Sequence, residues 1–290
     1  MSKATGHAAS PARILLFQSS GRREGNTARV VHMLETALKA DAVGCGMAIE
    51  TETLDLARMD IRPCRGCYGC FDRGEHACPL HDELASVKEK MRAADGLVLA
   101  APVYVSDLNG IMKNWIDRLA YICHRPEFAG KTAMLCATTG FTPARRALRS
   151  MWYAAWAWGY RIAHQVSFVT GGTRGSPGRS VAKGMSLMPA EELAARYSQK
   201  IERAARKFLK DIRDRRVEKP SFFSLMAFRI GQAVVSQRAE PDSLDFSYWK
   251  DKGWLDTRSC TYFVSHRANP AKVAGARLMG SMAALVFRAS

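Results

Sequence analysis

Four cysteines lie within fifteen residues of the sequence, in the segment PCRGCYGCFDRGEHACP. The first three are spaced C-x2-C-x2-C, and the fourth follows after seven further residues and precedes a proline; they are Cys64, Cys67, Cys70 and Cys78. This spacing allows one short loop to bring four sulfurs to one point, which is typical of a metal centre such as an iron-sulfur cluster. Structural zinc is an alternative because four thiolates suit it equally well, and free or redox-switching thiols are a third.

A polar loop, SSGRREGNT, follows the apolar run at residues 13–17 and precedes a helical pattern over residues 26–39. Such a loop collects backbone N–H groups and the positive end of a helix dipole at one spot, which suits a phosphate group. The loop also offers hydroxyl, guanidinium and amide donors from Ser20, Arg22, Asn26 and Thr27. An ordinary helix cap at Asn26 is the alternative interpretation.

The elements that would position these residues alternate along the chain. Apolar or alternating runs predict strands, and patterns of helical period between and after them predict helices. Strands are expected at 13–17, 48–56, 96–101, 131–138 and 160–169, and helices at 26–39, 82–94, 110–121, 143–158 and 189–213. This order predicts an α/β fold with a doubly wound five-stranded parallel sheet, in which ligands bind beyond the carboxyl ends of the strands.

Two segments resemble the flavodoxin-like NAD(P)H-dependent FMN reductases. SSGRREGNT is similar to their G-S-x-R-x-x-G-N-T loop, and APVYVSDLNGIMKNWIDR at 101–118 is similar to their s-P-V-Y-x-x-x-x-x-G-x-x-K-x-x-x-D-R signature. Ser19 and Gly21 depart from the first pattern, since the family usually has Gly and Pro there. The resemblance implies a flavodoxin-like fold, bound FMN and NAD(P)H as the electron donor.

The resemblance also implies roles for individual residues. Ser20, Arg22, Asn26 and Thr27 would hold the FMN phosphate; Pro102, Val103 and Tyr104 would line the flavin ring; and Thr138, Thr139 and Gly140 would form a third loop. Tyr104 is the candidate for shaping the environment of the ring. Lys113, Asp117 and Arg118 are instead expected to form ion pairs on a helix surface. For a nicotinamide 2'-phosphate, the candidates are Arg145, Arg146 and Arg174.

A compact cysteine run between the second strand and second helix of such a fold is similar to the iron-sulfur flavoproteins, over residues 11–170. That resemblance implies a [4Fe-4S] cluster and an oxidoreductase that passes electrons from NAD(P)H through FMN to a small-molecule or protein acceptor, in a homodimer or homotetramer. One alternative is a flavin-only quinone, azo or nitro reductase with zinc or no metal on the cysteines. Another is a non-enzymatic electron carrier or redox sensor that docks an acidic partner.

Composition narrows the classes of partner and location. The net charge is +16, and residues 141–215 hold 15 basic and 5 acidic side chains, yet no nucleic-acid-binding module is recognisable. No run of eighteen uncharged apolar residues and no secretory signal occurs, so we expect a cytoplasmic protein without membrane contact. Eight cysteines without an export signal make a disulfide framework the weaker explanation of the cluster.

Three parts are expected along the chain: a flexible tail at 1–10, an FMN-binding domain at 11–215 with the cysteine loop at 61–82, and a helical extension at 216–290. Residues 170–183, rich in Gly, Ser and Arg, are expected to form either a mobile connection or a loop that a ligand orders. In the extension we expect helices at 222–235 and 270–287 and irregular structure in FSYWKDKGWL. The extension is expected to pack on the domain, where it would either support an oligomer contact or cap the flavin pocket.

Overall fold

The computed structural model describes residues 10–171, 188–214 and 217–289 of the chain. The predicted tail, apart from Ser10, and most of the predicted connection at 170–183, including Arg174, lie outside the described residues. Within them, no helix has both the length and the apolar character needed to cross a bilayer.

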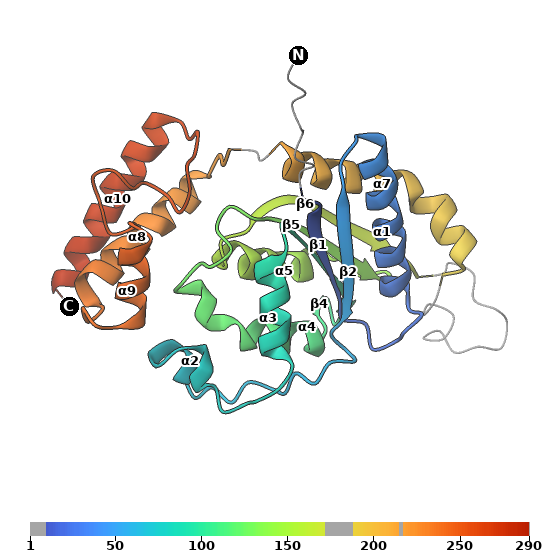
Figure 1. Ribbon diagram of the computed structural model, residues 1–290, viewed down its shortest axis with the longest axis horizontal. Coiled ribbons are helices and arrows are strands. Elements are labelled where there is room, and N and C mark those ends of the chain that lie inside the picture. The colour runs from blue at the N-terminus through green and yellow to red at the C-terminus, as the bar shows by residue number, and fades with distance from the viewer. Residues whose placement is uncertain (1–9, 172–187, 215–216, 290) are drawn as a thin grey trace, which may run out of the picture.

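A twisted sheet of five parallel strands forms the centre of the fold, which confirms the predicted architecture (Figure 1). Its order is β2-β1-β3-β5-β6, so the strand order reverses between β1 and β3. The register sets Gln18 opposite Ala100 and Pro102 opposite Thr138, which brings three strand ends to the same edge. The strands are β1 (Ala12–Gln18), β2 (Ile49–Asp55), β3 (Gly96–Tyr104), β5 (Thr132–Thr139) and β6 (Arg161–Val169).

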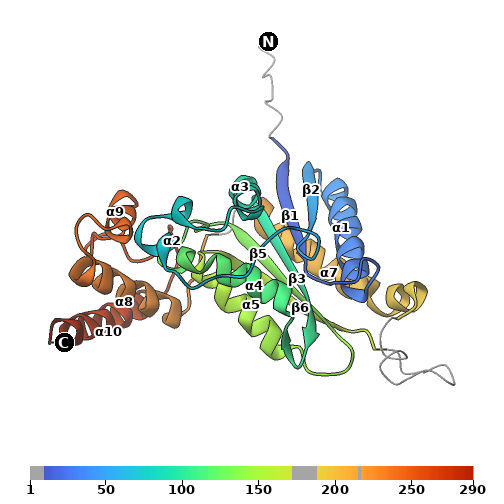
Figure 2. The ribbon, with the colours of Figure 1, turned by 90° about the horizontal axis from the view of Figure 1, so that it is seen from below.

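Helices cover both faces of the sheet (Figures 1 and 2). On β1, Leu15 and Phe17 pack into one buried cluster while Ile14 and Leu16 pack into the other, because successive strand residues point to opposite faces. One face carries α1 (Asn26–Gly44) and α7 (Ala190–Arg213); the other carries α3 (Leu84–Ala93), α4 (Gly110–Arg118) and α5 (Arg145–Ala157). The predicted helix at 110–121 ends early, and a 3-10 turn at Ala120–Cys123 follows it.

The C-terminal extension forms a small helical unit with its own aromatic core, and we call residues 217–289 the cap. It contains α8 (Phe222–Arg238), α9 (Leu244–Asp251) and α10 (Pro270–Ala289). Phe228, Trp249 and Trp254 are buried at its centre. Figure 1 shows the cap beside the end of the domain that carries α2 (Gly69–Asp72), on the opposite side from α1 and α7.

The prediction of irregular structure in FSYWKDKGWL was wrong, because its first part belongs to α9. Ser243 caps this helix by accepting a hydrogen bond from the N–H of Phe246, and Trp249 faces the cap core. Aromatic residues facing both α8 and the domain hide the helical period that a single apolar face would show. The cap packs on the domain as predicted: Trp249 Nε1 donates to the carbonyl of His124 at 2.7 Å.

Candidate functional site

The loop between β1 and α1 is folded by its own hydrogen bonds around the start of the helix. The N–H of Ser20 donates to Gln18 Oε1 at 2.8 Å, and the N–H of Arg22 donates to Ser20 Oγ at 3.2 Å. No side chain caps α1, and its first turn holds no acidic residue. A Cβ on Gly25 would lie 3.0 Å from Ser20 Oγ, a tight contact that would push on the loop. This geometry suits an anion at the helix N-terminus.

Asn26 and Thr27, predicted as phosphate ligands, direct their side chains into the protein. Asn26 Nδ2 donates to Thr170 Oγ1 at 2.9 Å, and Asn26 Oδ1 accepts from the N–H of Met188. The hydroxyls of Thr27 and Thr138 lie 2.6 Å apart. These buried contacts join the start of α1 to the ends of β5 and β6, so both side chains hold the loop in place. Their part in phosphate binding stays a prediction, and Arg22 lies exposed in the same loop.

The predicted ring-lining residues stand at the end of β3, where Pro102 is buried and Tyr104 is 47% exposed. A two-residue turn joins β3 to β4 (Asp107–Leu108), with Tyr104 paired to Asp107. Val105 and Ser106 form the turn at φ of 49° and 65°, and Val105 is fully exposed. A β-branched residue at positive φ is strained, and such strain is concentrated at functional sites. The sequence does not reveal this hairpin, because its turn lacks the usual Asn or Gly.

Ser19 and Asn109 connect the first two loops, although they lie 90 residues apart in the chain. Ser19 Oγ donates to Asn109 Oδ1 at 2.8 Å, and Asn109 Nδ2 donates back to the carbonyl of Ser19 at 2.5 Å. Both side chains are buried. Ser19, a departure from the family pattern, therefore has a structural reason. Asn109 was missed as a site residue; its position directly before the helical pattern at Gly110 was the available signal.

The third predicted loop, Thr138 to Gly140, lies at the end of β5 beside β6. Thr139 Oγ1 donates to the carbonyl of Thr142 at 2.8 Å, and the carbonyl of Thr139 accepts from the N–H of Thr170 at 2.7 Å. The register of β1, β3 and β5 brings all three predicted loops to one edge of the sheet. The structure thus brings the proposed cofactor residues together, and their ligand roles stay predictions.

The cysteine loop runs from β2 to α3 and is attached to α4. The N–H of Cys64 donates to Asn114 Oδ1 at 3.3 Å, and Asn114 Nδ2 donates to the carbonyl of Ile61 at 2.9 Å. All four cysteines line one cavity of about 760 Å³, together with His76 and His81. Cys64 and Cys67 are exposed, and Cys70 and Cys78 are half-buried.

The four thiols interact with one another electrostatically. Burial raises the pKa of the Cys70 thiol, and its electrostatic interaction with Cys78, Cys64 and Cys67 raises it further. In the described part of the chain, no three His, Cys, Asp or Glu side chains converge closely enough for one metal ion. Four thiols lining one cavity are the donor set that both a four-iron cluster and structural zinc use.

Arg118, the last residue of α4, lines this cavity. Its side chain is 2% exposed and that of its partner Asp82 is 0% exposed, with Arg118 Nη1 2.6 Å from Asp82 Oδ2. The same guanidinium donates to the carbonyl of Arg62 and approaches Cys78 Sγ at 3.8 Å. Burial opposes the charge on Asp82, but hydrogen bonds from Arg118 and the N–H of Arg62 outweigh it and lower the pKa of Asp82.

The expectation of helix-surface ion pairs was therefore only half right. Lys113 and Asp117 do form an exposed pair at 2.5 Å on α4. Arg118 instead points into the protein because its partner comes from the start of α3, 36 residues earlier in the chain. Local spacing along a helix does not reveal such a partner.

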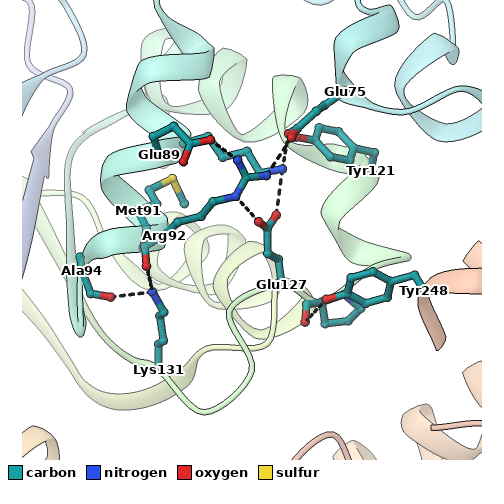
Figure 3. Close-up of polar contacts among 11 residues, drawn as sticks. Glu75, Glu89, Met91, Arg92, Ala94, Tyr121, Glu127, Lys131 and Tyr248 are labelled. Atoms are coloured by element: carbon teal, nitrogen blue, oxygen red, sulfur yellow. Dashed lines mark hydrogen bonds and ion pairs between the residues drawn. The ribbon is translucent and has the colours of Figure 1, made fainter. Parts of the chain in front are cut away.

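A second ionic cluster anchors the long arm between Cys70 and Cys78 (Figure 3). Arg92 Nη2 lies 2.8 Å from Glu75 Oε1, and Tyr121 donates to Glu75 Oε2 at 2.7 Å. Lys88, which is buried, also pairs with Glu75 and lies 2.8 Å from Glu127. Burial raises the pKa of Glu75, but the bonds from these three donors outweigh it and lower that pKa to about 2. Glu75 is thus a charged carboxylate, and its bonds to Lys88 and Arg92 fix the arm to α3.

Comparison with known proteins identifies a family and relatives for part of the chain. A family model described as NADPH-dependent FMN reductase matches residues 12–170. An iron-sulfur flavoprotein of Methanocaldococcus jannaschii is 33% identical over 106 residues, which cover 37% of this chain and 51% of that protein. An iron-sulfur flavoprotein of Archaeoglobus fulgidus is 34% identical over 112 residues, covering 39% and 47%. The matches thus span about half the length of these relatives.

Solved structures share the fold. A flavone reductase superposes with a TM-score of 0.50 at 14% identity, over 70% of this chain and 63% of that chain. At this identity the likeness concerns the architecture alone.

Proposed function

The chain belongs to the NADPH-dependent FMN reductase family, and from this we propose that it is an NAD(P)H-dependent FMN oxidoreductase with a four-iron cluster on Cys64, Cys67, Cys70 and Cys78. The names of its iron-sulfur flavoprotein relatives support the cluster. Electrons would pass to an acceptor that is either a small molecule or an electron-transfer protein. The acceptor, like the expected homodimer or homotetramer, stays a prediction.

One observation carries the proposal: a single short helix contacts both candidate sites. Asn109 directly precedes α4 and bonds to Ser19 in the phosphate loop. Further along the same helix, Asn114 and Arg118 bond to the cysteine loop. Nine helical residues span about 14 Å at about 1.5 Å each. A rigid element of this length would hold a flavin and a cluster at a fixed and short separation.

The chain's own residues would position FMN and stabilise its charge. The backbone N–H groups at the start of α1, with Ser20 and Arg22, would bind the phosphate. Pro102, Val103 and Tyr104 would line one side of the ring, and the Thr138–Gly140 loop would line another. FMN supplies the exchange between two-electron nicotinamide chemistry and one-electron transfer. Arg145 and Arg146, exposed at the start of α5, stay the described candidates for a nicotinamide 2'-phosphate.

Chemical composition tests the proposal directly. Protein purified without oxygen is expected to carry about one FMN with about four iron and about four sulfide per chain. NADPH or NADH should bleach the flavin absorbance. Zinc in place of iron would contradict the cluster and support the flavin-only alternative, whereas a colourless protein that refuses added FMN would contradict the proposal as a whole.

Two glycines of the phosphate loop offer a matched test of the FMN site. In Gly25→Val the new side chain would press on Ser20 and Arg22 and shift the loop, because even a Cβ lies at tight contact distances of 3.0–3.2 Å from their atoms. We expect this overpacking to weaken FMN binding by about tenfold to a hundredfold. Gly21→Val is the control, since no atom lies within 4 Å of a Cβ there. Flavin fluorescence titration measures both, and equal affinities would place the phosphate elsewhere.

A further inference from the structure

The cysteine loop contains a helix that is too short to be stable by itself. Helix α2 has four residues, Gly69–Asp72, and includes Cys70. A helix of this length has almost no internal hydrogen bonds, and its last carbonyls have no partner within it. Its geometry must therefore be imposed by neighbouring residues, and the direction of the Cys70 thiol depends on them.

Arg125 supplies that support. Its guanidinium donates to the carbonyl of Cys70 at 2.6 Å and to the carbonyl of Phe71 at 3.0 Å. A cation at the C-terminal end of a helix satisfies free carbonyls and complements the helix dipole. The Arg125 side chain is 11% exposed, so these are charge-assisted bonds with little competition from water.

Arg125 is in turn held by the cap. Asp245, in the first turn of α9, accepts from Arg125 Nη1 at 2.9 Å with one oxygen. Its other oxygen lies 2.8 Å from His124 Nδ1. The ring of His124 packs edge-on against Phe71 at 4.9 Å between centroids. Through His124 and Arg125, the cap and the cysteine loop thus form one chain of contacts that runs from Asp245 to Cys70.

We propose that the cap positions the cysteine loop. Asp245 fixes Arg125, and Arg125 fixes α2, so that Cys70 faces the cavity and the cysteine loop keeps its conformation. The cap occupies residues 217–289, beyond the segment matched by the FMN reductase family, and lies on the side of α2 (Figures 1 and 2). This assigns the cap to the cysteine loop and not to the flavin pocket. The inference rests on the proposed function only in that Cys70 serves as a metal ligand.

The test compares Asp245→Asn and Arg125→Gln with Tyr248→Phe. Tyr248 also joins the cap to the domain, through a hydrogen bond from its hydroxyl to the carbonyl of Pro126 at 3.2 Å, but that bond does not touch the cysteine loop. The readouts are the rate of Cys70 alkylation by iodoacetamide, followed by peptide mass spectrometry, and the rate of iron release to a chelator. Alkylation is measured on the protein as purified and again after chelation.

We expect Asp245→Asn and Arg125→Gln to accelerate both rates by about tenfold or more, because each breaks a charge-assisted bond. Arg125→Lys should restore part of the protection, since lysine keeps the charge but cannot donate to two carbonyls with one planar guanidinium. Tyr248→Phe should change the rates less than about twofold. Unchanged rates in both test variants, or equal acceleration in Tyr248→Phe, would overturn the proposal. If the purified wild type contains no iron, the cluster part of the proposed function fails, while alkylation of Cys70 after chelation still decides the role of the cap.

Discussion

Cys67→Ser is expected to remove the iron and sulfide from the protein while FMN stays bound at about one per chain. A serine hydroxyl is a harder and far less acidic ligand than a thiolate, so the cluster loses one of its four anchors. The FMN loops are expected to be unaffected, because they are held by Ser19, Asn109 and Thr27, none of which belongs to the cysteine loop. Metal analysis and the visible spectrum after anaerobic purification measure both contents.

The same variant separates the two half-reactions. NAD(P)H should still reduce the bound flavin, whereas electron delivery to a one-electron acceptor such as a haem protein should fall to the background rate. Cys45→Ser is the matched control, since Cys45 is also an exposed cysteine but lies at the end of α1, outside the cavity. A Cys67→Ser protein that keeps its iron, or that loses FMN together with the iron, would contradict two separate sites.

The sheet could be predicted because parallel strands buried on both faces appear in the sequence as continuous apolar runs. GLVLAA is such a run, and it forms the first six residues of β3, all of them buried. The hairpin after it could not be predicted in this way, since Val105 and Ser106 adopt positive φ without the residues that favour it. Tertiary context imposes that turn, and local preference does not.

The candidate site shows the same division. The cysteine spacing and the phosphate loop are local patterns, and the structure places each on the element predicted for it. The contacts that hold each of them in place are long-range: Asn109 bonds to Ser19 across 90 residues, and Arg125, which supports the cysteine loop, bonds to Asp245 across 120. No periodicity along the chain contains these partners, so a single sequence gives no means of finding them. They become visible only when the strands and the cap are packed.

Arg118→Met is expected to cost about 3–5 kcal/mol of folding free energy, because it leaves the carboxylate of Asp82 buried without its cation. Methionine keeps much of the length and apolar character of the arginine stem, so the loss reflects charge and hydrogen bonds more than volume. Urea unfolding followed by circular dichroism measures it. Lys113→Met on the same helix breaks only the exposed pair with Asp117 and should cost at most about 0.5 kcal/mol.

The double variant Arg118→Met with Asp82→Leu decides whether the buried pair is there for stability or for the cysteine loop. Replacing both members of a buried pair by apolar side chains removes the uncompensated charge, so most of the lost folding free energy should return. Iron retention should not return with it, because Arg118 also holds the carbonyl of Arg62 and lies 3.8 Å from Cys78 Sγ. A stable double variant that still sheds iron would show that the Arg118–Asp82 pair orients the cysteine loop, since Asp82 also accepts from the N–H of Arg62. If iron retention recovered along with stability, the arginine would serve the fold alone.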